Sequence, residues 1–337
     1  MTAEEPVLFD LSKPDLSCKI PHGTCLLSYR GSIAHGMYVP NSDPNSIDDV
    51  DLMGIVLAPE NHYLGLTDWG SRGTKEYKES KYDCVFYELR KAFSLLLHGN
   101  PNILSMLWIE PRHFLFIGTS GRQIIENRHL FAGKHVYASF AGYASAQLQK
   151  METREPAELR EYIAITKELK YRGAHPTHKG EKFDRPDDTP VSEAKDAAEW
   201  DTDRLLARLR HYQKKGENIG YLGDKRKELV LEHGYDSKNA AHCIRLLRMC
   251  RGFLRTGEME VFRSDACELL EIKRGKWPLE QVKAHAEDLF LQIKAARDAS
   301  SLPDEPDREG AERLMMSILR AHIQFDPPCQ ISDLLRR

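Results

Sequence analysis

The spacing of apolar residues changes near residue 120, and this change constrains the fold more than any other feature of the chain. Before it, short apolar or alternating runs predict strands over 24–29, 49–58 and 81–89. Short helical patterns lie between and after these strands, over 33–38 and 90–98. The first part of the chain is therefore predicted to form a small α/β head, in which a mixed sheet carries helices.

Beyond this point, apolar residues recur three and four positions apart, which is the period of an α-helix. Helices are expected over 140–151, 156–172, 193–215, 239–257, 278–298 and 310–323. With 337 residues the chain exceeds one average domain. We predict an α+β protein with two domains: the head over 1–118 and an α-helical domain over 119–337.

The overall charge gives no general attraction for nucleic acid, because 48 Lys and Arg residues face 51 Asp and Glu residues. A polyanion partner must be bound by a local basic surface. The first residues lack a basic segment followed by an apolar one, and no run approaches eighteen apolar residues. We expect a cytoplasmic protein without membrane contact. The seven cysteines show no CxxC pair, which is typical of reduced thiols.

A Gly-Ser pair follows the first predicted strand and begins a short helix. Glycine allows close approach at such a turn, and the N–H groups of the first helical turn point outward. Gly31 and Ser32 are therefore predicted to bind a phosphate, with Arg30 supplying positive charge nearby. A Gly-Ser turn alone is common and weakly informative.

Two aspartates at the start of the second predicted strand strengthen this interpretation. Residues two apart on a strand point to the same face, so Asp49 and Asp51 would project side by side while Val50 enters the core. Adjacent carboxylates repel each other unless a cation lies between them, and hard oxygen ligands favour Mg²⁺ or Mn²⁺. The alternative, a charged alternation at a strand edge, would be favoured for an isolated Asp-x-Asp.

A third carboxylate is needed to hold two metal ions and to activate an incoming hydroxyl. The third predicted strand offers Asp83 near its start and Glu88 near its end. We predict Asp83, because a neighbouring strand can place it beside the other two. Glu88 is the alternative, although it can equally serve the beginning of the following helix.

These motifs together resemble one family. The order Gly-Ser, helix, Asp-x-Asp and Asp on the next strand is the signature of polymerase β nucleotidyltransferases. More narrowly, GSIAHG, DVDLMGI and the stretch YELRKAFSLLLHGNPNILSMLW resemble the RlaP group, the RNA-repair-pathway DNA polymerase β family, as do later segments up to about residue 310. Family members usually carry their carboxylates about eleven residues after the motif serine, where this chain has Asp43, so Asp43 is a rival of the later pair.

The resemblance implies a nucleotidyltransferase head and a helical domain that holds nucleotide and acceptor. It implies two Mg²⁺ ions on the three aspartates, with Mn²⁺ as a substitute, and a nucleoside triphosphate as donor. It also favours nucleotide contacts by Asn102 and by three cations on one helical face, Lys238, His242 and Arg245. Asn102 could instead cap a helix, and the three cations could be a solvated face.

The predicted reaction is transfer of a nucleoside monophosphate to an acceptor hydroxyl, with release of pyrophosphate. The family's association with RNA repair favours an RNA end, such as that of a tRNA. A protein or small-molecule acceptor and a catalytically silent nucleotide-binding module are the alternatives. The sequence does not indicate which nucleotide is preferred or whether the chain forms oligomers.

Overall fold

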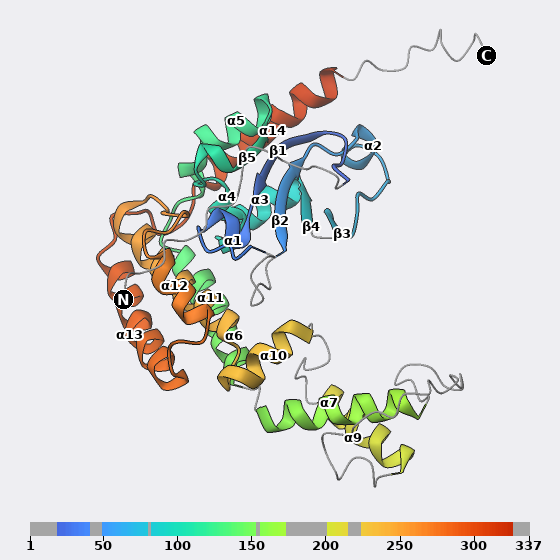
Figure 1. The fold of residues 1–337 in the computed structure, drawn as a ribbon. Helices are drawn as coiled ribbons and strands as arrows, with labels where there is room; N and C mark the ends of the chain where they lie inside the picture. Colours follow the sequence, from blue (N-terminus) through green and yellow to red (C-terminus); the bar gives the residue numbers. More distant parts are fainter. Residues whose placement is uncertain are drawn as a thin grey trace, which may run out of the picture. The chain divides into compact units, whose positions relative to one another are not determined.

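A computed structural model describes residues 19–40, 49–79, 82–152, 156–172, 201–214 and 224–325. The described residues pack as two units (Figure 1). The first unit falls within Met1–Ala144, Cys243–Leu270 and Ala284–Arg337, and the second within Ser145–His242 and Glu271–Lys283. The chain thus leaves the first unit and returns to it, whereas the sequence pattern predicts a single boundary after residue 118.

The first unit contains a five-stranded mixed sheet with the strand order β3-β4-β2-β1-β5 (Figure 1). The strands are β1 (Thr24–Tyr29), β2 (Val50–Val56), β3 (Thr74–Glu79), β4 (Tyr82–Glu88) and β5 (Phe114–Ile117). β2 and β4 run parallel, and the other neighbouring pairs run antiparallel. The predicted architecture, a mixed sheet with helices followed by a helical region, is confirmed.

The helices of the head are short and follow the strands. Their bounds are α1 (Gly31–Ala34), α2 (Glu60–Tyr63), α3 (Leu89–Leu97), α4 (Pro101–Met106) and α5 (Thr119–Glu126), with 3₁₀ turns at Pro111–His113 and Arg128–Phe131. α3 contacts β2 and β4, α5 contacts β1 and β5, and the later helix α14 (Arg308–Phe325) contacts both α3 and α5. The sheet is therefore supported by helices from both ends of the chain.

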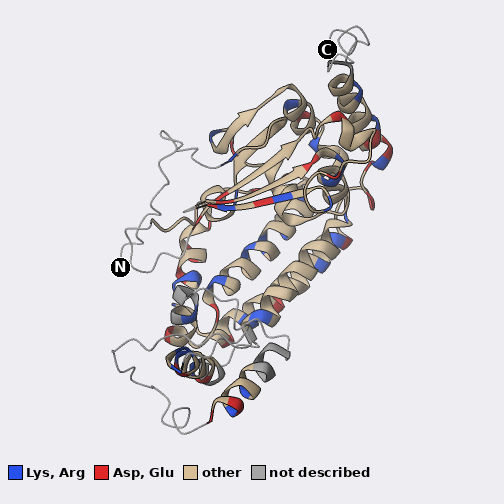
Figure 2. Ribbon diagram, turned by 90° about the vertical axis from the view of Figure 1, so that its right-hand side faces the viewer, with Lys and Arg blue, Asp and Glu red and all other residues tan. Residues whose placement is uncertain are grey.

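The remaining helices form the body that the sequence pattern predicts. They are α6 (Val136–Glu152), α7 (Pro156–Tyr171), α9 (Thr202–Lys214), α10 (Asp224–His233), α11 (Ser237–Thr256), α12 (Ala266–Lys273) and α13 (Leu279–Asp298). In the second unit, α7, α9 and α10 bury a small core that includes Ile165, Leu205 and Val230. Figure 2 shows that charged residues of both signs are spread over these helices and along the sheet.

Alternation along the strands divides the sheet into two faces. One face belongs to a buried cluster to which Leu27, Leu52 and Phe86 contribute. The residues between them point to the opposite face. That second face carries Asp51 and Asp83, so the predicted metal ligands share one side of the sheet.

The cysteines fit the prediction of reduced thiols wherever the structure describes them. All five described cysteines are free. Burial raises the pKa of three of them, Cys25, Cys243 and Cys250, to about 12. We refer to these three as the buried thiols. None of the helices in the described parts of the chain combines the length and the hydropathy that spanning a bilayer requires.

Candidate active site

The turn between β1 and α1 requires glycine for two reasons. Gly31 has a φ of +62°, in the left-handed region that L side chains rarely adopt. A Cβ atom added there would lie 2.1 Å from the Asp51 Oδ2 atom. The Arg30 N–H donates to the Asp51 carbonyl at 2.9 Å, which fixes the strand beside the turn. The Gly-Ser turn and Asp51 are therefore in direct contact, as the sequence predicts for one site.

Strand register brings four charged residues into one line across the sheet. Lys78 on β3 is the register partner of Asp83 on β4, and Asp83 is the register partner of Asp51 on β2. Arg30 follows β1 and bonds to Asp51 through the backbone. Register partners project their side chains to the same face of a sheet. We call Lys78, Asp83, Asp51 and Arg30 the charged row, in which two acids lie between two bases.

The bases neutralise the acids directly. Arg30 Nη2 lies 3.2 Å from Asp83 Oδ1 and 3.6 Å from Asp51 Oδ1. Lys78 Nζ lies 3.2 Å from an oxygen of Asp49, just before β2. This hydrogen bond, together with the charge of Asp49, raises the pKa of Lys78. Each of the three predicted aspartates therefore pairs with a basic side chain, and Lys78 joins the candidate site although no sequence pattern indicated it.

The donor set suits a hard divalent cation. Among the described residues, no group of three or more His, Cys, Asp or Glu side chains is already arranged around a point that could hold a metal ion. However, one atom, Arg30 Nη2, lies within ion-pair distance of both Asp51 and Asp83. A single positive charge is thus accommodated between these two carboxylates, and the guanidinium occupies the place of a cation. The residues present fit the expected group.

The structure describes one of the two alternative metal ligands, Glu88, but not the other, Asp43. Glu88 caps α3: its carboxylate accepts hydrogen bonds from the backbone N–H groups of Arg90 at 2.9 Å and Lys91 at 2.6 Å, and the residue is buried. The helix-start role of Glu88 that the sequence left open is therefore observed. Asp43 lies outside the described residues, so its rivalry with Asp49 stays open.

The Gly-Asn-Pro-Asn turn is capped differently from the expected way. The side chain of Asn100, rather than that of Asn102, caps α4 by accepting a hydrogen bond from the Asn102 N–H at 3.0 Å. Pro101 occupies the first helical position, where its missing N–H costs nothing, so the cap falls on Asn100, two residues before Asn102. Asn100 also donates to the Tyr143 hydroxyl at 2.7 Å. Asn102 is exposed, and its predicted nucleotide contact stays a prediction.

A buried histidine anchors the end of α1. His35 Nδ1 lies 2.9 Å from the Val261 carbonyl, so this nitrogen donates its proton and the other ring nitrogen accepts. The guanidinium of Arg245 supplies that second bond at 2.5 Å. Backbone pairing adds a third link, from the Arg263 N–H to the His35 carbonyl at 3.2 Å. These bonds join the Gly-Ser turn and α1 to α11 and to the segment after it.

Arg245 is therefore held inside the first unit by contacts within the protein. It is buried, it bonds to His35 and Met249, and desolvation lowers its pKa to about 9. Lys238 and His242, the other members of the predicted basic face, are half-buried on α11 in the second unit. The three residues share a helix but not a unit. Their predicted nucleotide contacts stay predictions.

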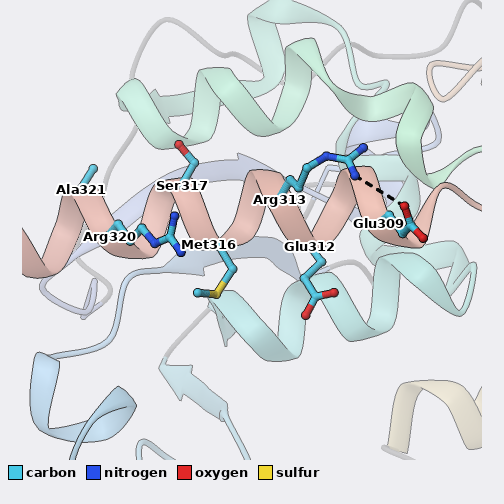
Figure 3. Close-up of a pocket in the computed structure, with 7 residues that line it drawn as sticks. All are labelled: Glu309, Glu312, Arg313, Met316, Ser317, Arg320 and Ala321. Atoms are coloured by element: carbon cyan, nitrogen blue, oxygen red, sulfur yellow. Dashed lines mark ion pairs between the residues drawn. The ribbon is translucent and has the colours of Figure 1, made fainter.

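A pocket on the outer side of α14 is separate from these residues (Figure 3). All its lining residues belong to α14, from Glu309 to Ala321, and an ion pair of 3.6 Å joins Arg313 to Glu309. None of the predicted site residues lines it. The candidate site is therefore the charged row beside the Gly-Ser turn.

A family match covers the part of the chain that contains the candidate site. Residues 17–169 match the family model RlaP, the RNA repair pathway DNA polymerase beta family. The match covers a little under half of the chain and includes the turn, the charged row and Asp49. It confirms the resemblance of this stretch to that family, which the sequence motifs indicate. No curated protein and no solved structure matches the chain.

Proposed function

We propose that the chain is a metal-dependent nucleotidyltransferase that moves a nucleoside monophosphate from a nucleoside triphosphate to a hydroxyl at an RNA end, releasing pyrophosphate. One observation carries the proposal: Asp51 and Asp83 are register partners on neighbouring parallel strands, directly beside the Gly31 turn. Such a pair concentrates negative charge where a phosphate-binding turn begins. This combination serves phosphoryl chemistry better than it serves stability.

The carboxylates would hold the metal. Asp49, Asp51 and Asp83 supply oxygen ligands for two Mg²⁺ ions, or for Mn²⁺ in their place. When bound, such ions polarise the transferred phosphate and favour ionisation of the acceptor hydroxyl. Asp83, whose side chain is 41% exposed, is also assigned the proton of that hydroxyl, because it is the carboxylate on the neighbouring strand.

The remaining residues would bind the triphosphate. The Gly31-Ser32 turn offers backbone N–H groups to the distal phosphates. Arg30 contributes a guanidinium that already reaches both Asp51 and Asp83, so it can neutralise charge on either side of the reacting phosphate. His35, at the end of α1, fixes the position of the turn through its hydrogen bonds to Val261, Arg245 and Arg263. Lys238 and His242 are assigned to the nucleotide or the acceptor, as predicted from their spacing.

The choice of RNA as acceptor rests on the family description, which places the matching proteins in an RNA repair pathway. The net charge of -3 means that RNA must be bound by local basic surfaces. A protein or small-molecule acceptor would use the same head, because the head acts on the triphosphate. The acceptor is therefore an outcome of the experiment below.

The test supplies the purified chain with Mg²⁺, each α-labelled nucleoside triphosphate in turn, and total cellular RNA. The double variant Asp49→Asn, Asp51→Asn removes the charge of two predicted ligands with little change of shape. Asp68→Asn is the matched control, because Asp68 is an exposed aspartate of the same unit outside the row. We expect label on RNA with the wild type and the control, and none with the double variant.

Other outcomes revise the proposal in defined ways. Label on protein or on a small molecule instead of RNA would keep the enzyme and change the acceptor. Equal labelling by the wild type and the double variant would place the chemistry elsewhere. Binding of a nucleoside triphosphate without any release of pyrophosphate would make the chain a silent nucleotide-binding module.

A further inference from the structure

The two basic residues of the charged row, Arg30 and Lys78, differ in how exposed their side chains are and in how many contacts hold them. The Arg30 side chain is 28% exposed and bonds to two carboxylates, and its backbone is tied to β2. The Lys78 side chain is 70% exposed and pairs with Asp49, whose side chain is 45% exposed. An exposed pair of this kind is weak and exchanges readily with solvent ions. Lys78 is therefore the base that an incoming ligand can displace most easily.

The positive charge of Lys78 has opposite effects on the binding of a free divalent cation and on the binding of a metal–polyphosphate complex. A bare divalent cation at Asp49 must displace the ammonium group and is then repelled by it. A metal–polyphosphate complex has a net negative charge, so the same ammonium group attracts it. A lysine beside the carboxylates thus weakens binding of the free ion and strengthens binding of the complex.

We propose that Lys78 makes this site select a divalent cation that already carries a polyphosphate over the free cation. The inference rests on the proposed function, because it takes Asp49 and Asp51 as metal ligands. It adds a role for Lys78 as a specificity-determining residue, set by the register that aligns it with Asp83 and by its 3.2 Å bond to Asp49. In the free protein Lys78 serves as the counter-ion of Asp49.

The strand itself supplies a matched control. Lys75 lies on β3 three residues before Lys78, and its register partner is Phe86 rather than Asp83. An odd spacing along a strand points it to the opposite face. Its ammonium group lies 4.5 Å from the centre of the Trp69 ring, away from the row. Lys78→Gln and Lys75→Gln therefore remove the same charge from the same strand on opposite faces.

The experiment measures binding and does not depend on turnover. Free Mn²⁺ is titrated onto the wild type and both variants, and bound ion is quantified by electron paramagnetic resonance. The titration is repeated with the complex of Mn²⁺ and inorganic tripolyphosphate, which removes any base preference. We expect Lys78→Gln to bind free Mn²⁺ about 3- to 10-fold more tightly and the complex about 3- to 10-fold more weakly. Lys75→Gln should resemble the wild type in both titrations.

Each remaining outcome overturns a defined part of the reasoning. If Lys78→Gln changes both affinities in the same direction, or neither, the selectivity role is wrong. If Lys75→Gln changes them as much, the effect is one of general charge. If Asp49→Asn, Asp51→Asn binds free Mn²⁺ and the complex as well as the wild type does, or if the wild type binds neither, the proposed metal site itself fails. Urea denaturation of every variant verifies that it is folded.

Discussion

Substitution of Gly31 by alanine tests whether the Gly-Ser turn and the carboxylates form one site. The left-handed backbone costs alanine about 1–2 kcal/mol. The new Cβ would also lie 2.1 Å from Asp51 Oδ2 and 3.2 Å from Asp51 Cβ. Because the Asp51 side chain is 26% exposed, its carboxylate can turn away and relieve the closest contact. The tight contact with its Cβ atom remains and adds about 1 kcal/mol.

The result should separate stability from binding. Gly257→Ala is the control, because Gly257 also has a positive φ, +74°, while its added Cβ meets only Leu302 at an ordinary 3.4 Å. Urea denaturation should show a loss of about 1–2 kcal/mol for the control and about 2–3 kcal/mol for Gly31→Ala. Mn²⁺ binding should fall about tenfold or more in Gly31→Ala only, because the displaced carboxylate leaves the charged row. Wild-type Mn²⁺ affinity in Gly31→Ala would refute the reasoning.

Three further predictions concern the supporting structure, and urea denaturation tests each. Raising the pH from 8 to 10 should cost about 3 kcal/mol. The buried thiols contribute a loss of about 4 kcal/mol, because they ionise only in the unfolded chain, whose thiol pKa of about 9 lies below the folded value; this stability is complete below pH 9 and is lost above it. Arg245 offsets about 1 kcal/mol, because its lowered pKa lets it lose its proton in the folded chain only. Cys25→Ala should remove about a third of the thiol contribution, and an unchanged slope would contradict it. His35→Leu should cost about 2–4 kcal/mol by leaving Arg245 buried without its acceptor, and adding Arg245→Met should restore at least half; additive losses would contradict this. Asn100→Ala should cost about 1–2 kcal/mol and Asn102→Ala less than about 0.5, whereas equal losses would argue against the observed cap.

Local pattern was sufficient for the central strands and most helices. β1, β2 and β4 were predicted because each is buried and largely apolar, and the helical body was predicted from its period. The two edge strands, β3 and β5, were not predicted, each for a different reason. β3 reads TKEYKE and is mostly polar on both faces, as an edge strand often is. β5 has only four residues, too few to show an alternation.

Within the site, a contact could be predicted only when its two residues lie close together in the sequence. Asp49 and Asp51 share a face because of strand geometry alone, so their sequence spacing was informative. The caps at Glu88 and Asn100 are also local, although Pro101 shifted the second by changing which residue begins the helix. His35 was missed as a positioning residue because its partner, Arg245, lies 210 residues away. No local pattern carries that pairing.

Register explains why the bases of the charged row are harder to predict than its acids. Lys78 faces Asp83 only because β3 and β4 pair with one particular alignment, and a shift of one residue would turn Lys78 to the other face. The sequence gives the types and order of these residues, but the alignment follows from burial of Cys84 and Phe86 on β4 against neighbouring strands. The packing of the core thus sets the position of Lys78. The apolar face of the sheet therefore determines which charged side chains meet on the opposite face.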